Sequence, residues 1–227
     1  MSNGMFRARI TYPKAGRLRF LSHLEVTNAC ERAARRAGLP YAVTQGFNPK
    51  MKVGFGPALP VGTGSTCERF DLWLREYVPA DEVLVRLQSA SPSDLAPSEA
   101  CYVALRAPAL TVSLTIAGYD VETGESGSAE DLQGFLDAVV KTGELVVEHK
   151  GKQKVFELTS TLPKEPTVRS MNGRVVVDIT TRMSERGSLR PEALVMAAFE
   201  RSGTGGSVLS VTRTHLAEEE EAVRRLL

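Results

Sequence analysis

Strand-type and helix-type patterns follow a similar order in both halves of this chain, with one extra strand in the second half, and that order restricts the folds it can adopt. The first half is predicted to run strand, helix, strand, strand, helix, strand at residues 5–12, 22–38, 41–44, 67–78, 79–95 and 100–107. The second half is predicted to contain strands at 110–122, 144–149, 152–162, 173–183 and 207–216, with helices at 128–143 and 190–203.

This order is that of the split βαβ unit of ferredoxin-like domains. The sequence therefore predicts an α+β protein of two ferredoxin-like (βαββαβ) units, each an antiparallel sheet with both helices on one face. We expect the first domain at residues 1–106, including a basic Gly-rich loop, and the second at residues 107–227, ending in a charged tail.

The first predicted helix has a clear start and a narrow apolar face. Ser22 and Glu25 form an S-x-x-E capping box, in which each side chain satisfies a free backbone N–H of the other residue. Val26, Cys30, Ala33 and Ala37 then recur at helical spacing, so small residues would face the sheet.

Cysteine and histidine spacing argues against a metal or cluster site. The three cysteines, Cys30, Cys67 and Cys101, are an odd number without CxxC or CxxxCxxC spacing, and the three histidines are equally scattered. We therefore expect reduced thiols, no metal and no cofactor.

The N-terminus has no apolar stretch of the secretory kind, and no window of the chain reaches the roughly 18–20 consecutive apolar residues that a membrane span needs. The sequence therefore favours a cytoplasmic protein that does not associate with a membrane.

Positive charge is concentrated at the N-terminal end. Residues 1–60 hold ten Lys or Arg residues against two Glu, a net +8, whereas the whole chain carries only +1. A local excess of cations attracts polyanions such as nucleic acid. The alternative is that these cations pair with acids of the second half.

The segment QGFNPKMKVGFGPALPVGTGS, residues 45–65, is dense in glycine and proline. It matches neither GxGxxG nor GxxxxGK[ST], so no nucleotide P-loop is expected. Its mixture of Phe47, Lys50, Lys52 and Phe55 with glycines suits contacts with a phosphate backbone and a stacked base. A turn-rich hairpin with buried aromatic residues is an equally valid interpretation.

The motifs RLRFLSHLEV, GLPYAVTQGFNP and EHKGKQKVFEL closely resemble a bacterial family of radical SAM-associated, or radical SAM-linked, proteins of unknown function. The resemblance covers almost the whole chain. It implies a separate radical SAM enzyme as partner and an RNA or ribosome-related substrate. The chain lacks the CxxxCxxC cluster motif and would itself be the companion. Lys50 follows Asn48–Pro49 where the family often has a histidine or another basic residue.

The leading hypothesis is thus an accessory module that binds RNA or presents an RNA or ribosomal substrate, without catalytic activity of its own. The candidate nucleic-acid-binding residues are Arg17, Arg19, His23, Arg35, Arg36, Phe47, Asn48, Lys50 and Lys52.

Two alternatives remain open. One is a protein-interaction scaffold that binds an acidic partner without nucleic acid. The other is a metal-independent endoribonuclease, because the chain is distantly similar to CRISPR repeat-processing enzymes; His23 would then be the general base, with Lys50 or Arg19 stabilising the transition state. A purely structural role for His23, packed beside Phe20, is also possible.

Overall fold

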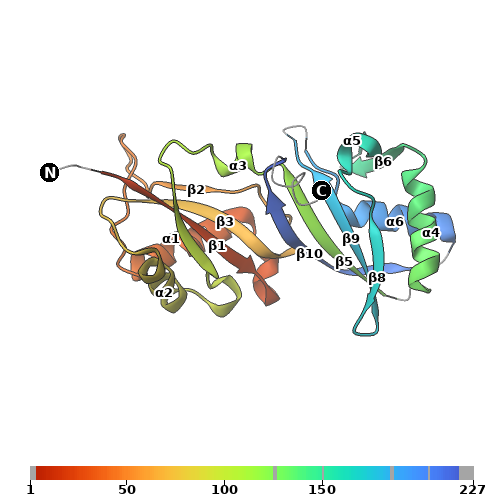
Figure 1. Cartoon of the computed structure of the whole chain (residues 1–227), viewed down its shortest axis with the longest axis horizontal. Coiled ribbons are helices and arrows are strands. Elements are labelled where there is room, and N and C mark those ends of the chain that lie inside the picture. The colour runs from red at the N-terminus through yellow and green to blue at the C-terminus, as the bar shows by residue number, and fades with distance from the viewer. Residues whose placement is uncertain (1–3, 125–126, 150, 185–186, 204, 220–227) are drawn as a thin grey trace. The chain divides into compact units, whose positions relative to one another are not determined.

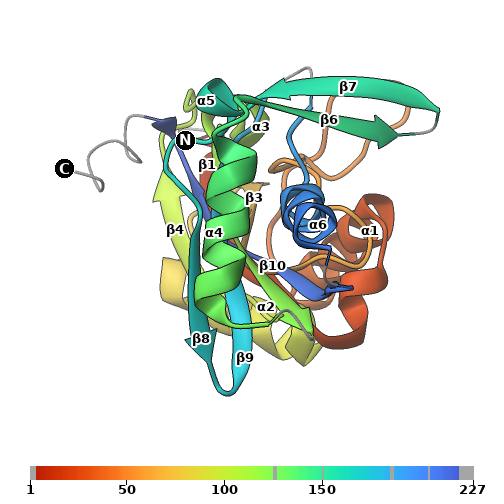
Figure 2. The same ribbon diagram turned by 90° about the vertical axis from the view of Figure 1, so that its right-hand side faces the viewer.

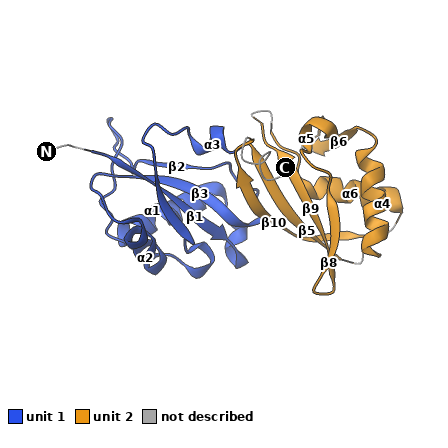
Figure 3. Ribbon diagram, in the orientation of Figure 1, with its two compact units in different colours: residues 1–114 blue, residues 115–227 orange. Residues whose placement is uncertain are grey.

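The computed structural model describes residues 4–124, 127–149, 151–184, 187–203 and 205–219. The chain is a mixed α+β protein that divides into two compact units, residues 1–114 and 115–227 (Figure 3). No helix in the described part of the chain is long and apolar enough to cross a membrane.

The first unit is built on a four-stranded sheet with two main helices (Figure 1). Its elements are β1 (Phe6–Lys14), η1 (Gly16–Phe20), α1 (His23–Arg36), β2 (Val53–Phe55), β3 (Gly64–Leu74), α2 (Ala80–Ala90), η2 (Ser93–Leu95), β4 (Glu99–Val103) and α3 (Leu110–Ser113). The strands lie in the order β4-β1-β3-β2, and each neighbouring pair is antiparallel. The second strand was expected at residues 41–44, but only single bridges form there, Tyr41 to Leu74 and Val43 to Met51.

The second strand lies instead within the Gly-rich segment, where Gly54 comes against the Trp73 ring. A Cβ on Gly54 would lie 3.6 Å from the ring, so β2 runs in ordinary contact with a large side chain. Strand propensity did not reveal β2 because it is only three residues long and has glycine at its centre.

Helix α1 confirms the local predictions. The capping box is formed in both directions, and Val26, Cys30 and Ala33 are buried. They contact the sheet residues Ile10 and Leu72 in one core, to which α2 adds Val83 and Leu87. The small residues therefore let α1 lie close to the sheet.

The opposite face of this sheet carries a buried ionic cluster. Arg7 on β1 donates to Asp71 on β3 from Nε (3.0 Å) and Nη2 (2.6 Å), and Arg9 donates to the same carboxylate from Nε (2.9 Å). Arg7 also donates to the carbonyl oxygens of Ala107 and Pro108. The guanidinium of Arg7 thus ties the chain that follows β4 to the sheet.

Because Arg7 binds the carbonyl oxygens of residues 107 and 108, these residues belong to the first unit. The sequence placed the boundary between residues 106 and 107, whereas the compact units meet between residues 114 and 115. Leu110 and Leu114 are 2% exposed, and α3 contacts β2 and β3. Residues 110–113, expected as the start of a strand, form a helical turn instead.

The second unit has a similar plan with one insertion. Its elements are β5 (Ile116–Gly124), α4 (Ala129–Val140), β6 (Glu144–His149), β7 (Lys152–Glu157), α5 (Leu158–Thr161), β8 (Thr167–Met171), β9 (Arg174–Arg182), α6 (Pro191–Ser202) and β10 (Ser207–Ala217). The strands lie in the antiparallel order β10-β5-β9-β8, and α4 and α6 share one core with Val121 and Ile179.

Strands β6 and β7 were expected in this sheet, but they form a separate two-stranded hairpin (Figure 2). The edge position is filled by β8, which the sequence did not indicate. Residues 158–161, expected to continue the β7 strand, are the helical turn α5. Alternation shows that a segment is extended but not which strand it pairs with, and β8 is short, with two half-buried side chains.

The Asp71 cluster makes a stability prediction. Arg7 is 4% and Asp71 1% exposed, so Asp71→Asn leaves two guanidinium groups facing a neutral amide in a buried site. Removing one partner of a buried ion pair costs about 3–5 kcal/mol, and we expect Asp71→Asn to lower the free energy of unfolding of the first unit by about 3 kcal/mol. Urea titration followed by fluorescence of Trp73, the single tryptophan, measures this unit.

The matched control is Glu31→Gln, which removes an exposed i,i+4 pair with Arg35. Exposed pairs contribute about 1 kcal/mol or less, so this variant should unfold close to the wild type. Equal stability of Asp71→Asn and Glu31→Gln would contradict the central role of Asp71.

A second prediction concerns thiol reactivity. Burial raises the pKa of Cys30 to about 12, so at pH 8 only about one molecule in ten thousand carries the reactive thiolate. Cys101 is exposed, although partial burial raises its pKa as well. Alkylation by iodoacetamide, mapped by mass spectrometry, should modify Cys101 in the folded protein and Cys30 only after unfolding. Equal rates at the two thiols in the folded protein would disprove the burial of Cys30.

Candidate nucleic-acid interface

A long stretch of the first unit contains no acidic residue. Between Glu31 and Glu68 there is no Asp or Glu, whereas five cations occur: Arg32, Arg35, Arg36, Lys50 and Lys52. The stretch begins in α1, passes through the Gly-rich segment and ends in β3. Its positive charge is therefore not neutralised by carboxylates of the same segment.

Within this stretch, residues 44–50 form a loop closed by hydrogen bonds. The backbone N–H of Thr44 donates to the carbonyl oxygen of Lys50 (2.8 Å), and the N–H of Lys50 donates to Thr44 Oγ1 (3.1 Å). Gly46 has φ +151°, which residues with a side chain rarely adopt. Phe47, between these closures, is fully exposed at 109% relative area. We name residues 44–50 the tip loop.

The tip loop brings together four of the predicted residues. Phe47, Asn48 and Lys50 lie in it and are exposed, and Lys52 follows directly at its base. The Nζ of Lys52 lies 5.3 Å from the centre of the Trp73 ring, a cation–π contact. Neither lysine has an acidic partner among the described residues.

Trp73 itself is not a free stacking surface. Besides Lys52, the Arg7 guanidinium carbon lies 4.8 Å from the ring centre. With Gly54 at its edge, the half-buried ring is a structural contact of the sheet.

His23 is the first residue of α1 and is exposed. Its ring meets Phe55 edge to face, with centres 5.8 Å apart, and Phe55 stacks on Phe70 at 5.4 Å. His23 therefore contacts the Gly-rich segment, and the expected neighbour Phe20 lies under the Arg19 guanidinium instead (4.9 Å). Among the described residues, no group donates to or accepts from the imidazole nitrogens.

Arg17 and Arg19 belong to η1 and lie on the same side of the unit as the end of the Gly-rich segment. The carbonyl oxygen of Arg19 accepts from the N–H of Gly62 (2.9 Å). Arg17 is exposed and has no acidic partner in the described ranges. The Nε of Arg19 is buried without a hydrogen bond, and its guanidinium covers Phe20.

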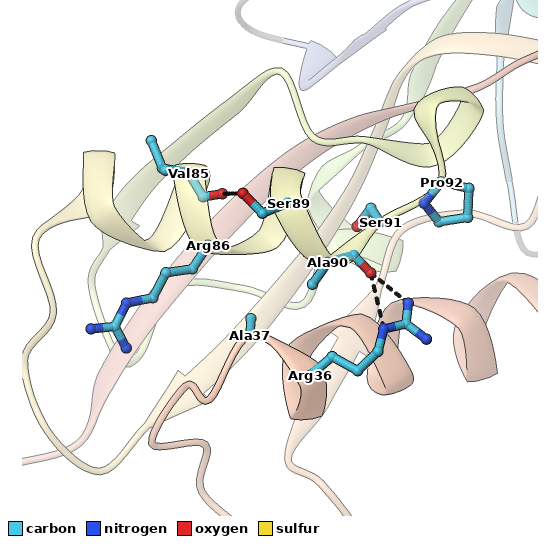
Figure 4. Close-up of a pocket in the computed structure, with 8 residues that line it drawn as sticks. All are labelled: Arg36, Ala37, Val85, Arg86, Ser89, Ala90, Ser91 and Pro92. Carbon is cyan, nitrogen blue, oxygen red and sulfur yellow. Dashed lines mark hydrogen bonds between the residues drawn. The ribbon is translucent and has the colours of Figure 1, made fainter.

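Arg35 and Arg36 lie at the other end of α1, about 20 Å from His23 at 1.5 Å per helical residue. Arg35 pairs with Glu31 (2.9 Å). Arg36 donates from Nε (3.2 Å) and Nη2 (2.5 Å) to the carbonyl oxygen of Ala90 at the end of α2 (Figure 4). There it lines an open hollow of about 610 Å³ between the helices. Both arginines thus have intrachain partners, and the Arg36 contact caps α2.

Two aromatic residues of this surface make contacts that the sequence did not indicate. Phe55 joins His23 to the sheet, and Phe20, 58% exposed, carries Arg19. The only sequence signals were that Phe55 stands between two glycines and that Phe20 follows an arginine. Neither signal shows which side chain an aromatic ring will meet, because these contacts join segments far apart in the sequence.

Other kinds of site receive no support from the described residues. No three His, Cys, Asp or Glu side chains gather there in a way that could hold a metal ion. His149 and His215 lie in β6 and β10, outside the first unit.

Comparison with known proteins identifies one family. Residues 7–191 match the family described as "Uncharacterized protein conserved in bacteria (DUF2344)". A comparison with curated proteins finds no match.

Two solved structures align with most of the chain at low similarity. They are an archaeal box H/ACA sRNP Nop10-Cbf5 complex (12% identity, TM-score 0.46) and a Cbf5-Nop10-Gar1 complex (12% identity, TM-score 0.45). Each alignment covers 94% of this chain, which spans about half (50%) of the matched chain. A heme complex of the Rhodococcus jostii RHA1 DypB N246H variant aligns with a TM-score of 0.24 and 10% identity, covering 96% of this chain and 94% of that chain.

The capping box at the start of α1 predicts a lowered pKa for the Glu25 carboxyl. The backbone N–H of Ser22, and then its hydroxyl, donate to Glu25 and hold the pKa of that carboxyl below its ordinary value of 4.5. Because the folded pKa is lowered, the cap contributes its full stability above pH 4.5 and loses it as pH falls through the folded pKa. Glu25 titrated by carbon NMR should show this low pKa.

Substituting the serine tests the cause. Ser22→Ala removes the hydroxyl contact and should bring the pKa of Glu25 part of the way back toward 4.5, with more fraying at His23. An unchanged pKa in Ser22→Ala would show that the hydroxyl does not stabilise the carboxylate.

Proposed function

The chain belongs to the family of uncharacterized proteins conserved in bacteria (DUF2344), and from this premise we propose that it is an RNA-binding accessory protein of a separate radical SAM enzyme. In this proposal the first unit binds RNA, or presents an RNA or ribosome-related substrate, and the partner enzyme carries out the chemistry.

The observation that carries the RNA-binding part is that several cations of the first unit have no carboxylate partner. Asp71 pairs with both Arg7 and Arg9, whereas Lys50, Lys52 and Arg17 have no acidic partner among the described residues. The tip loop presents the exposed Phe47 beside this charge. Cations next to an exposed aromatic ring are the combination by which proteins bind single-stranded nucleic acid.

The radical SAM part rests on the resemblance of three motifs, RLRFLSHLEV, GLPYAVTQGFNP and EHKGKQKVFEL, to radical SAM-associated proteins. Two of these motifs coincide with the candidate surface. The first spans η1 and the start of α1, and the second ends in the tip loop. A partner that acts on bound RNA would need access to this same surface.

The ferredoxin-like description of each unit is also a proposal. It is supported by the antiparallel orders β4-β1-β3-β2 and β10-β5-β9-β8. In each unit the first and third strands of the sheet lie at its centre, and the fourth and second strands lie outside them, as in a split βαβ unit. In the second unit the β6–β7 hairpin and α5 would be an insertion between the first helix and the second strand.

RNA binding can be tested by fluorescence anisotropy with a labelled single-stranded 20-mer RNA at 50 and 200 mM KCl. Each phosphate contact adds about 0.7 to the slope of log K against log salt for single strands. We expect wild-type affinity to fall steeply with salt, and Lys50→Ala/Lys52→Ala to bind roughly tenfold more weakly with a shallower slope.

The matched control is Lys141→Ala, which removes one exposed lysine from the second unit and should bind like the wild type. The proposal is overturned if the wild type does not bind at low salt, or if its affinity does not depend on salt. Equal losses in the double variant and in Lys141→Ala would place the interface elsewhere.

A further inference from the structure

The tip loop presents Phe47 in a way that specifies the chemistry of its ligand. At 109% relative exposure the side chain lies wholly in water, and no aromatic ring or cation among the described residues contacts it. Most aromatic side chains are at least partly buried, so a fully exposed ring on a closed loop indicates a surface that a ligand covers.

Hydrogen bonds order the backbone that carries this ring before any ligand arrives. Two hydrogen bonds between Thr44 and Lys50 close it, the Val43–Met51 bridge lies directly below, and Met51 is 5% exposed. Pro49 further limits the backbone. A ligand that covers Phe47 therefore has little loop conformation left to order.

We infer that Phe47 stacks on one unpaired base of a single-stranded nucleic acid, with Lys50 and Lys52 on the adjacent phosphates; this rests on the RNA-binding function proposed above. The neighbours of Phe47 favour a base over an apolar protein pocket. Along the chain they are Gln45, Gly46, Asn48 and Pro49, so no second large apolar side chain of the tip loop extends the ring into the apolar core that a protein interface needs. Asn48 also has both an amide donor and an amide acceptor available to a base edge.

The same geometry excludes a regular duplex as the preferred ligand. Base faces in a duplex are covered by neighbouring base pairs, and a stacking ring reaches them only where the strand is unpaired. The inference therefore predicts selection for single strands, loops or ends, and dependence on bases as well as phosphates.

The test compares three probes of equal length under identical salt: a 15-mer of uridine, an abasic 15-mer with the same phosphates, and a 15-bp duplex. Stacking contributes about 1–3 kcal/mol per base, which converts to a five- to 150-fold preference for the uridine strand over the abasic strand. Phe47→Ala should lose most of this preference while keeping the salt slope of the wild type, because the lysines remain.

Two further variants make the result specific. Phe47→Trp should keep the preference, and its added emission, relative to the wild type with Trp73 alone, should be quenched by the uridine strand but not by the abasic strand. Val112→Ala removes a different exposed apolar side chain (69% exposed) and should leave all three affinities unchanged.

The outcomes separate this inference from the function on which it rests. Salt-dependent binding with equal affinity for uridine and abasic strands, or a preference retained in Phe47→Ala, overturns base stacking and leaves RNA binding in place. Absence of salt-dependent binding to every probe overturns both. A duplex preference over the uridine strand also overturns the single-strand assignment.

Discussion

One buried carboxylate organises the first unit. Asp71 accepts hydrogen bonds from Arg7 and Arg9 on the neighbouring strand, and Arg7 reaches on to the carbonyl oxygens of residues 107 and 108. Because a buried charge is tolerated only when its partners are well placed, this contact joins β1, β3 and the chain after β4 into one arrangement. The same Arg7 guanidinium lies over the Trp73 ring and holds residues 107 and 108 in the first unit.

The same carboxylate determines which cations remain for function. The N-terminal charge of +8 is not a uniform basic face, because Arg7 and Arg9 are held by Asp71, Arg35 by Glu31 and Arg36 by a helix terminus. Of the other cations, Lys14 is buried, Arg32 lies on α1, and the rest belong to η1, the tip loop and its base. The proposed interface is therefore smaller than composition suggests, and it coincides with the segments in which glycine and exposed aromatic residues occur.

The features predicted well from sequence are those set by near neighbours along the chain. The Ser22–Glu25 box and the small-residue stripe of α1 depend on residues within one or two turns, so their spacing is sufficient. Strand partners and aromatic contacts depend on residues far apart. For this reason the sequence placed β6 and β7 in the wrong sheet, missed β2 and β8, and did not indicate that His23 contacts Phe55. The full exposure of Phe47 likewise depends on the path of the tip loop, which residue spacing does not give.

His23 shows how position limits chemistry. A general base needs a substrate proton within reach and usually a second group that orients the imidazole. The contact that His23 makes is the edge of Phe55, which holds the ring by packing and can neither accept nor relay a proton. Through Phe55 and Phe70 the imidazole is instead linked to the strands that support the Gly-rich segment. The geometry thus favours a positioning role for His23, in which the start of α1 is held against the Gly-rich segment at Phe55.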